Sequence, residues 1–416
     1  MIDRRMILTG ATGAALAAGA ASQVQAAPGR GGSPDVVVVG AGAFGGWAAL
    51  SLRERGLKVV SVDQYGPSSP RSSSAGETRS IRSGYGSDAF YAEWAAKAMV
   101  LWKMRQAEFG RTLLYQNDRL ELANSWLPNM VAQRQIFDKL KIPYEVLERA
   151  ELRRTYPQMN FDDVEFAFIE KTSAALIKAR ESMITVSEVF QKKGGEFRIA
   201  RAMPGPSTGS RMTALALDGG ETLSAAQFVF ALGPWSPKVL PDVMGPKVSV
   251  NRSEYHYWGV PAGDDRFSWP KQPAWHDYVR GGYGFGSLER GLKYSPSGGG
   301  GPTGQVDPDT LERVAAPERL TRGRDYIAHR FPGMAGAPLL ETRVCQMESP
   351  SNSHFIIDRH PAFENVWIAS GGGGHGFKHG PMVGEYVADR ITGRPTDPAV
   401  DKFFQLATHA NRVRRG

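Results

Sequence analysis

Asp35-Val36-Val37-Val38-Val39-Gly40-Ala41-Gly42-Ala43-Phe44-Gly45 is the stretch that decides the fold of this 416-residue chain. Its four consecutive valines predict a strand that is buried on both faces, and the glycines follow at once. Residues 46–55 are rich in Ala and Leu and predict a helix that ends at Gly56. Residues 58–62 predict a second strand, which delivers Asp63. This order is typical of a βαβ unit that binds a dinucleotide.

Each glycine of this unit has a distinct physical task. Gly40 permits the tight turn, Gly42 lets the backbone approach a pyrophosphate, and Gly45 lets the helix pack closely on the strand. The N-terminus of the helix offers unpaired N–H groups to the anion. Asp63 is expected to bind the ribose hydroxyls, and its charge disfavours a 2′-phosphate. A glycine-rich turn without a ligand is the alternative. The residues expected to bind the dinucleotide here are Gly40, Gly42, Ala43, Phe44, Gly45, Asp63 and Gln64.

Composition and charge place the chain among soluble globular proteins with two domains. The sequence has 41% hydrophobic and 22% charged residues, and 416 residues are too many for one ordinary core. The net charge is +8, but the basic residues are scattered rather than gathered in runs with aromatic residues. This pattern favours a solvated surface that attracts anionic ligands, and we expect no nucleic-acid binding. The eight histidines show no ligand-spaced cluster, so we expect no bound metal.

The first 27 residues have the features of an export signal. Asp3-Arg4-Arg5-Met6-Ile7-Leu8 resembles a twin-arginine motif, and Val24-Gln25-Ala26 offers small residues where a signal peptidase cleaves. The apolar run is too short and too weakly apolar to span a membrane comfortably. We therefore expect a periplasmic or secreted protein with no membrane contact once residues 1–27 are removed. An ordinary N-terminal tail is the alternative.

Cys345 is the single cysteine of the chain, so an exported form cannot make an internal disulfide. A lone cysteine is most often a small buried apolar residue. The alternative is a reactive thiol with a specific task. The residues alone leave both roles open.

The remaining sequence indicates a dinucleotide-binding domain that is built from separate segments. Helices are expected over residues 89–108, 127–139, 149–156, 175–193, 317–331 and 381–391. Strands are expected over residues 119–124, 227–232 and 366–370, and the aromatic-rich stretch 248–293 predicts strands of a second sheet. Residues 68–86 and 295–303 are expected to be loops. This interleaving is typical of FAD enzymes and not of simple NAD dehydrogenases.

The predicted fold class is therefore α/β, with a Rossmann-like FAD-binding domain in discontinuous segments. The inserted substrate domain is expected to rest on a mixed or antiparallel β-sheet. We place the FAD-binding domain at residues 34–114, 175–247 and 345–412, and the substrate domain at 115–174 and 248–344.

Four stretches together carry a resemblance to a known family. They are the glycine motif at 40–45, Gly76-Glu77-Thr78-Arg79-Ser80-Ile81-Arg82, Arg343-Val344-Cys345-Gln346-Met347, and the region from His354-Phe355-Ile356-Ile357-Asp358 to Gly374-His375-Gly376-Phe377-Lys378. On these motifs, residues 35–408 resemble the monomeric sarcosine oxidases, flavoproteins of the D-amino-acid-oxidase fold. The resemblance implies FAD as cofactor.

The resemblance also implies how the flavin is held. A cysteine placed as Cys345 is bonded in that family to the 8α-methyl carbon of the flavin, so covalent attachment is expected. Arg79 resembles a family residue near the flavin ring. The glycine run before the last helix is expected to aim a helix N-terminus at the pyrimidine edge, where it favours negative charge on the reduced ring. The residues implied here are Gly374, Gly376, Phe377 and Lys378.

For the chemistry, the resemblance implies four residues. Arg82 and Lys378 are expected to bind the substrate carboxylate, because a bidentate arginine beside a lysine charge suits that group. Lys293 is expected to lie over the flavin and to activate dioxygen. Tyr283 corresponds to a tyrosine of the substrate pocket, although the intervening segment is one residue shorter here.

Two departures from the family pattern concern the substrate cavity. Ser74-Ala75 stands where the family commonly has two histidines, and Ser297 stands where it has a further histidine. These smaller, uncharged residues put sarcosine itself in doubt and predict a bulkier substrate.

The expected function is that of an exported, monomeric FAD-dependent oxidase of secondary amines or N-substituted amino acids. It would oxidise the C–N bond to an imine and reduce dioxygen to hydrogen peroxide. A flavin dehydrogenase with a quinone or protein acceptor, and a biosynthetic or non-catalytic flavoprotein, are the alternatives. A plain NAD dehydrogenase fits the sequence less well.

Overall fold

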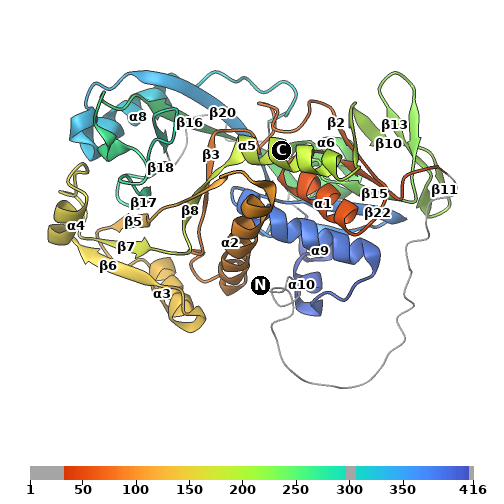
Figure 1. Ribbon diagram of the computed structural model, residues 1–416, viewed down its shortest axis with the longest axis horizontal. Coiled ribbons are helices and arrows are strands. Elements are labelled where there is room, and N and C mark those ends of the chain that lie inside the picture. The colour runs from red at the N-terminus through yellow and green to blue at the C-terminus, as the bar shows by residue number, and fades with distance from the viewer. Residues whose placement is uncertain (1–31, 297–305, 412–416) are drawn as a thin grey trace.

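The computed structural model describes residues 32–296 and 306–411 (Figure 1). The expected signal with Arg4, Arg5 and Ala26 lies outside the described residues, as does Ser297. Two large sheets organise the fold. The six-stranded sheet with α1 and α9 lies at the right of Figure 1, and the eight-stranded sheet with α8 lies at the left. Within the described residues, no helix is long and apolar enough to cross a membrane.

The six-stranded sheet has the order β21-β22-β15-β1-β2-β9. Neighbouring strands in it are parallel, except that β21 is antiparallel to β22. The strands are β1 (Val36–Val39), β2 (Val59–Asp63), β9 (Glu196–Ile199), β15 (Gln227–Phe230), β21 (Ile356–His360) and β22 (Phe363–Ser370). Val36 and Val38 enter one hydrophobic core, and Val37 and Val39 enter another on the opposite face. The four valines therefore form the central strand buried on both faces that the sequence predicts.

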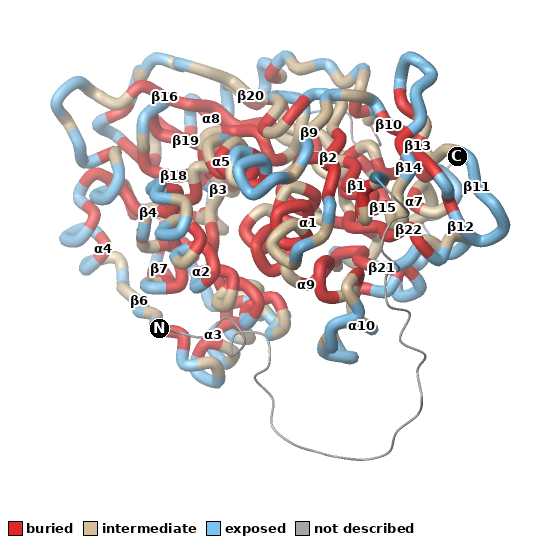
Figure 2. Tube along the Cα trace, turned by 45° about the vertical axis from the view of Figure 1, so that its right-hand side comes forward, coloured by how far each residue is buried: buried red, intermediate tan, exposed pale blue. Residues whose placement is uncertain are grey.

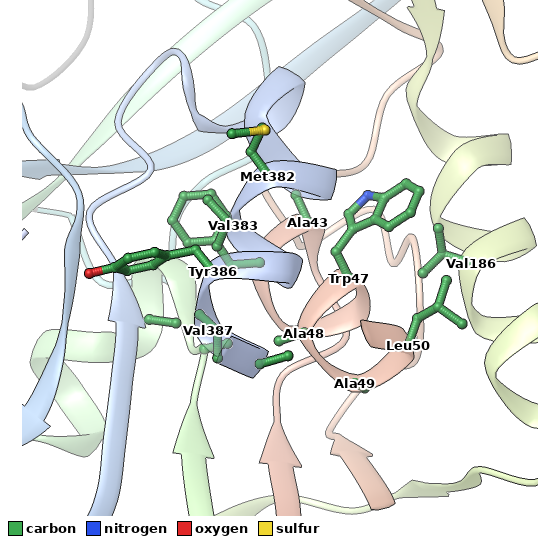
Figure 3. Packing of buried hydrophobic residues seen from close by; sticks show 14 of the residues in the cluster. Ala43, Trp47, Ala48, Ala49, Leu50, Val186, Met382, Val383, Tyr386 and Val387 are labelled. Carbon is green, nitrogen blue, oxygen red and sulfur yellow. The ribbon is translucent and has the colours of Figure 1, made fainter. Parts of the chain in front are cut away.

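Helices α1 (Ala43–Glu54), α9 (Gly380–Thr392) and α5 (Ala179–Lys192) cover one face of this sheet. In Figure 3, Trp47 and Ala48 of α1 lie between Val383 of α9 and Val186 of α5. A Cβ atom on Gly384 would lie 2.6 Å from the carbonyl oxygen of Trp47, so α9 needs glycine there to approach α1 closely. Figure 2 shows this region as mostly buried, whereas β11 is exposed and α10 has no buried residue.

The second sheet has eight strands in the order β20-β16-β19-β18-β17-β5-β7-β6, antiparallel except between β17 and β5. The expected mixed sheet is therefore present. Its strands are β5 (Arg119–Ala123), β6 (Tyr144–Glu148), β7 (Phe166–Glu170), β16 (Val248–Trp258), β17 (Ala274–Asp277), β18 (Tyr283–Phe285), β19 (Leu292–Ser295) and β20 (Leu339–Pro350). One face packs Trp258, Trp275 and Tyr294 against α8 (Pro317–Arg330).

Smaller elements complete the fold. A three-stranded sheet joins β3 (Thr78–Ile81), β8 (Ala175–Lys178) and β4 (Leu114–Gln116). The other helices are α2 (Ala89–Phe109), α3 (Pro128–Leu140), α4 (Arg149–Thr155), α6 (Ser236–Val239), α7 (Pro241–Met244) and α10 (Pro398–Phe403). Short strands β10 (Ala202–Pro204), β13 (Ala214–Leu217) and β14 (Thr222–Ser224) form one ribbon, and β11 (Ser207–Thr208) with β12 (Arg211–Met212) forms another.

Four expectations from the sequence need correction. The helix expected from residue 175 begins at Ala179, because the apolar residues 175–178 form β8, which pairs with β3 and β4. The loop expected over residues 68–86 contains β3, and Ser295 is the last residue of β19. The domain boundary placed at residue 345 falls inside β20. The remaining domain boundaries stay a prediction.

Candidate active site

A cavity of about 730 Å³ is lined by residues of both large sheets. The turn between β1 and α1, the segment 72–87, the glycine run 372–376 and one face of the eight-stranded sheet all contribute to its wall. Of the sixteen residues expected to bind cofactor or substrate, fifteen line this cavity and Gly45 does not. Segments far apart in the sequence therefore converge on one site.

The βα turn has the close packing that its glycines predict. Gly40 has φ +105°, and a Cβ atom there would lie 2.2 Å from the carbonyl oxygen of Ala231. A Cβ atom on Gly45 would lie 1.8 Å from the carbonyl oxygen of Gly40. Gly45 thus serves the packing of α1 on the strand, whereas Gly42, Ala43 and Phe44 line the cavity.

Asp63 ends β2 and organises the backbone around this turn. Its carboxylate accepts hydrogen bonds from the N–H groups of Ala41 at 2.8 Å, Tyr65 at 2.8 Å and Gly66 at 2.9 Å. Burial raises the pKa of Asp63, and these three N–H groups oppose that rise. Asp63 and Gln64 both line the cavity.

The Ser74 side chain caps the N-terminus of α1 from a distant segment of the chain. The sequence did not reveal this capping role. Its hydroxyl accepts a hydrogen bond from the N–H group of Ala43 at 2.9 Å. Ser74 lines the cavity, whereas its neighbour Ala75 is buried and does not. The signal for this role, a serine in a polar loop, is too general to be read from the sequence.

Arg79, Lys293 and Cys345 meet where β3 packs against the eight-stranded sheet. The Nη2 atom of Arg79 lies 4.0 Å from the Cys345 Sγ atom, and the Lys293 ammonium donates to the Thr78 carbonyl at 2.9 Å. Lys293 is 2% exposed and lies 4.2 Å from the centroid of the Tyr255 ring. Burial and the neighbouring Arg79 lower the pKa of Lys293 well below its ordinary value.

Arg82 and Lys378 face the same cavity with few partners of their own. The Arg82 guanidinium lies 4.7 Å above the Tyr85 ring, and its buried Nη1 atom has no hydrogen-bond partner among the described residues. The Lys378 ammonium donates to the Tyr85 hydroxyl at 2.9 Å and to the His375 carbonyl at 3.1 Å. Burial and Arg82 lower the pKa of Lys378 well below its ordinary value. Two buried cations side by side are stabilised by an anion between them.

Comparison with known proteins places the chain in a family. A family model described as FAD dependent oxidoreductase matches residues 35–390. The chain belongs to the FAD-dependent oxidoreductase family. Monomeric sarcosine oxidase of Streptomyces avermitilis is 28% identical over 375 residues, which cover 88% of this chain and 95% of that protein. N-methyl-L-tryptophan oxidase of Yersinia pestis is 25% identical over 89% of this chain and 98% of its own. These relatives confirm the resemblance to the sarcosine oxidases.

Solved structures show the same fold. Glycine oxidase from Geobacillus kaustophilus matches this FAD-dependent oxidoreductase with a TM-score of 0.77 and 18% identity, over 91% of this chain and 100% of its own. L-proline dehydrogenase from P. horikoshii has the same TM-score and identity, over 90% of this chain and 97% of its own. The predicted fold class is thereby confirmed.

The cavity of this FAD-dependent oxidoreductase has donors and space suited to FAD. A Cβ atom on Gly42 would meet only the Ser74 Oγ atom, at 3.3 Å, and Gly42 and Ala43 line the cavity, so the backbone of this turn is accessible to a pyrophosphate. The predicted contacts Gly374, Gly376 and Phe377 also line the cavity. Helix α9 itself begins only at Gly380, after a 3₁₀ turn over Gly376–His379. The glycine run therefore leads into the 3₁₀ turn, and not directly into the N-terminus of α9 as the sequence predicted.

Tyr85 links two histidines that sequence reasoning did not assign. Its hydroxyl lies 3.2 Å from the His375 Nδ1 atom and 2.8 Å from the His379 Nε2 atom. Burial and Lys378 lower the pKa of His375 to about 3, and the pKa of His379 is lowered well below its usual value for the same reasons. Both imidazoles are therefore neutral partners of Tyr85 at neutral pH.

A second polar group on the cavity wall was also missed. Arg119 and Glu121 of β5 form a buried ion pair, and His276 of β17 lies beside them. Burial opposes ionisation, but Arg119 keeps the pKa of Glu121 below its usual range. Burial and Arg119 lower the pKa of His276 to about 4. The only signal in the sequence was the pair of charges at alternate positions of a predicted strand.

Tyr283 lies at the edge of this wall. It belongs to β18, is 37% exposed and lines the cavity. Its register partner on β17 is His276. This position agrees with a pocket residue near the entrance rather than one deep in the site.

Proposed function

We propose that this FAD-dependent oxidoreductase oxidises the C–N bond of a secondary amine or an N-substituted amino acid to an imine. The electrons pass to dioxygen, which gives hydrogen peroxide. One observation carries the proposal: the buried Arg82 Nη1 atom lacks a partner in the described structure and faces the cavity with Lys378. The homology to sarcosine oxidases supports this reading of the pair.

The residues of the site perform four tasks in this proposal. Arg82 and Lys378 bind the substrate carboxylate, and the Tyr85 hydroxyl, 2.9 Å from the Lys378 ammonium, holds that lysine in place. Their positive field favours the neutral form of the amine, which is the form that can be oxidised. Lys293 supplies a cation for the reduction of dioxygen. Bound FAD supplies the two-electron acceptor. Its proposed contacts are the turn at 40–44, Asp63, Gln64, Arg79, Cys345 and the glycine run.

Anaerobic mixing with a panel of N-alkyl amino acids tests this function. Substrates should bleach the flavin absorbance without oxygen, and admission of air should restore it with release of hydrogen peroxide. Failure of every amine to bleach the flavin would support a non-catalytic or biosynthetic flavoprotein. Bleaching that air reverses only slowly would support a dehydrogenase with another acceptor.

The substrate is proposed to be bulkier than sarcosine. Ser74 lines the cavity where a larger histidine is common in the family, but its hydroxyl lies at the first turn of α1, beside Gly42. Ala75 does not line the cavity, and Ser297 is outside the described residues. The proposal of a bulkier substrate therefore rests on the departures from the family sequence pattern, and sarcosine as the best substrate would contradict it.

Replacement of Arg82 by alanine is expected to weaken turnover of carboxylated amines. Loss of one charge-assisted contact costs about 1.5–3 kcal/mol, which corresponds to roughly 10- to 150-fold in kcat/KM. Steady-state kinetics with the amino acid and its methyl ester measure the effect, and the ester should already react poorly with the wild-type protein. Arg154→Ala, at an exposed position of α4, is the matched control. An uncarboxylated amine as the best substrate would refute the binding of a substrate carboxylate by Arg82 and Lys378, which we call the carboxylate clamp.

Export through the twin-arginine pathway is proposed from the sequence motif alone. Replacement of Arg4 and Arg5 by lysine should leave active, flavin-containing enzyme in the cytoplasm, because that pathway reads the arginine pair. Activity measured in periplasmic and cytoplasmic fractions tests this. Unchanged export of the double variant would indicate another route.

A further inference from the structure

The wall formed by Arg119, Glu121 and His276 is built by two neighbouring strands. β5 and β17 are parallel, and Glu121 is the register partner of His276. Arg119 lies two residues before Glu121, so the three side chains share one face of the eight-stranded sheet. All three line the same cavity as Arg82 and Lys378.

Some hydrogen-bonding groups of this wall have no partner among the described residues. Glu121 is 2% exposed, and its two oxygens bind Arg119 and the Gln133 amide, the latter at 3.0 Å. Within the described residues, the Arg119 side chain hydrogen-bonds only to Glu121, although a guanidinium has five N–H donors. The buried Nδ1 atom of His276 has no partner there either. Buried polar groups are rarely left unpaired, so the unpartnered His276 Nδ1 atom indicates a ligand.

The charges of the wall select the kind of ligand. Arg119 and Glu121 compensate each other, and the His276 imidazole is neutral at neutral pH. The wall therefore carries no net charge of its own to compensate the desolvation of a charged group. A neutral group with both a hydrogen-bond donor and an acceptor suits it without that cost.

Arg82 connects this wall to the carboxylate clamp. Its charge influences the pKa of Lys378 on one side and the pKa values of Glu121 and His276 on the other. The two groups of residues therefore line one cavity and both feel the Arg82 charge.

We propose that Arg119, Glu121 and His276 form a subsite for a neutral hydrogen-bonding group of the substrate, such as a side-chain carboxamide. The inference rests on the proposed oxidation of N-substituted amino acids and names the side-chain class. Arg119 donates to the carbonyl oxygen of the amide, and His276 forms the second hydrogen bond. An apolar side chain of the same size leaves both groups desolvated and unpaired.

Three N-methyl amino acids of nearly equal size test the subsite on the flavin-loaded wild-type enzyme. N-methylasparagine should exceed N-methylleucine in kcat/KM by about 100-fold, because the leucine side chain leaves two buried polar groups unpaired. It should also exceed N-methylaspartate by about tenfold or more. Equal or better turnover of the leucine or aspartate compound would overturn the subsite while the oxidase function stands. Absence of flavin bleaching with all three and with every other N-alkyl amino acid would overturn the oxidase function itself.

A variant and a binding measurement separate recognition from folding and chemistry. His276→Leu should reduce the asparagine-to-leucine preference at least tenfold, with flavin content checked by absorbance. His360→Leu, the same change on β21 outside the cavity, should keep the preference. The 2-methoxy acids with the same side chains lack the reacting amine, and their dissociation constants by calorimetry should show the same preference. An unchanged ratio in His276→Leu together with equal binding of the analogues would refute the proposal.

Discussion

Cys345→Ser is expected to convert a protein that stays yellow after acid precipitation into one that releases all of its flavin. Cys345 lies on β20, lines the cavity and has its Sγ atom 4.0 Å from the Arg79 Nη2 atom. It is the only thiol of the chain, so no other cysteine can replace it. A serine hydroxyl is a far weaker nucleophile than a thiolate beside a cation. Flavin absorbance of pellet and supernatant measures the outcome.

The control for this experiment is Met347→Leu, two residues further along the same strand and also on the cavity wall. It should retain its colour in the pellet, because it keeps the thiol. A colourless precipitate from the wild-type protein would show that FAD is bound without a covalent bond. The expectation of a covalent bond between Cys345 and the flavin would then be withdrawn, whereas FAD binding by the family would stand.

Lys293→Met is expected to slow reoxidation of the reduced enzyme by air about 10²–10³-fold, the usual effect of removing one preorganised charge-stabilising group. The ammonium is buried beside Arg79 and the Tyr255 ring, where a positive charge acts through little water. Flavin reduction by substrate should change far less. Stopped-flow absorbance separates the two half-reactions. Equal effects on both would contradict a role in oxygen reduction.

The pH dependence provides a second signature of Lys293. Burial and Arg79 lower its pKa, so the cation is lost as the pH rises through that lowered value. Reoxidation by the wild-type enzyme should therefore slow with rising pH, and the Lys293→Met profile should lose this decline. Lys139→Met, at an exposed position of α3, should keep the wild-type profile.

The sequence predicts the nucleotide-binding half well because its signals are local. Four valines, a glycine turn and an acidic residue at the end of the next strand allow only one arrangement. The helix predicted from residue 175 was wrong at its start. A short apolar run such as Ala175-Leu176-Ile177 fits a buried strand as well as a buried helix, so periodicity cannot distinguish the two. Only its pairing with β3 and β4 decides the matter.

The polar wall of the cavity was beyond sequence reasoning for a different reason. Arg119 and Glu121 lie far from His276 in the sequence, and the three meet because β5 pairs with β17. These two strands are not consecutive in the chain, so no local sequence pattern predicts that they pair. The matched family motifs, by contrast, selected Arg82, Lys378, Lys293 and Cys345, which all line this cavity. Their roles in the reaction stay a prediction.

The position of β20 has a consequence for the way the molecule loses its structure. Cys345 is part of the eight-stranded sheet, whereas the βα turn at residues 40–45 belongs to the six-stranded sheet, and each sheet has a hydrophobic core of its own. If the flavin is bonded to Cys345 as we expect, and its pyrophosphate is held by the turn at 40–45, the cofactor would span both cores. Neither sheet could then melt without breaking contacts of the other, and the two halves would unfold as one cooperative unit. The flavin would then stabilise the folded protein in addition to taking part in its reaction.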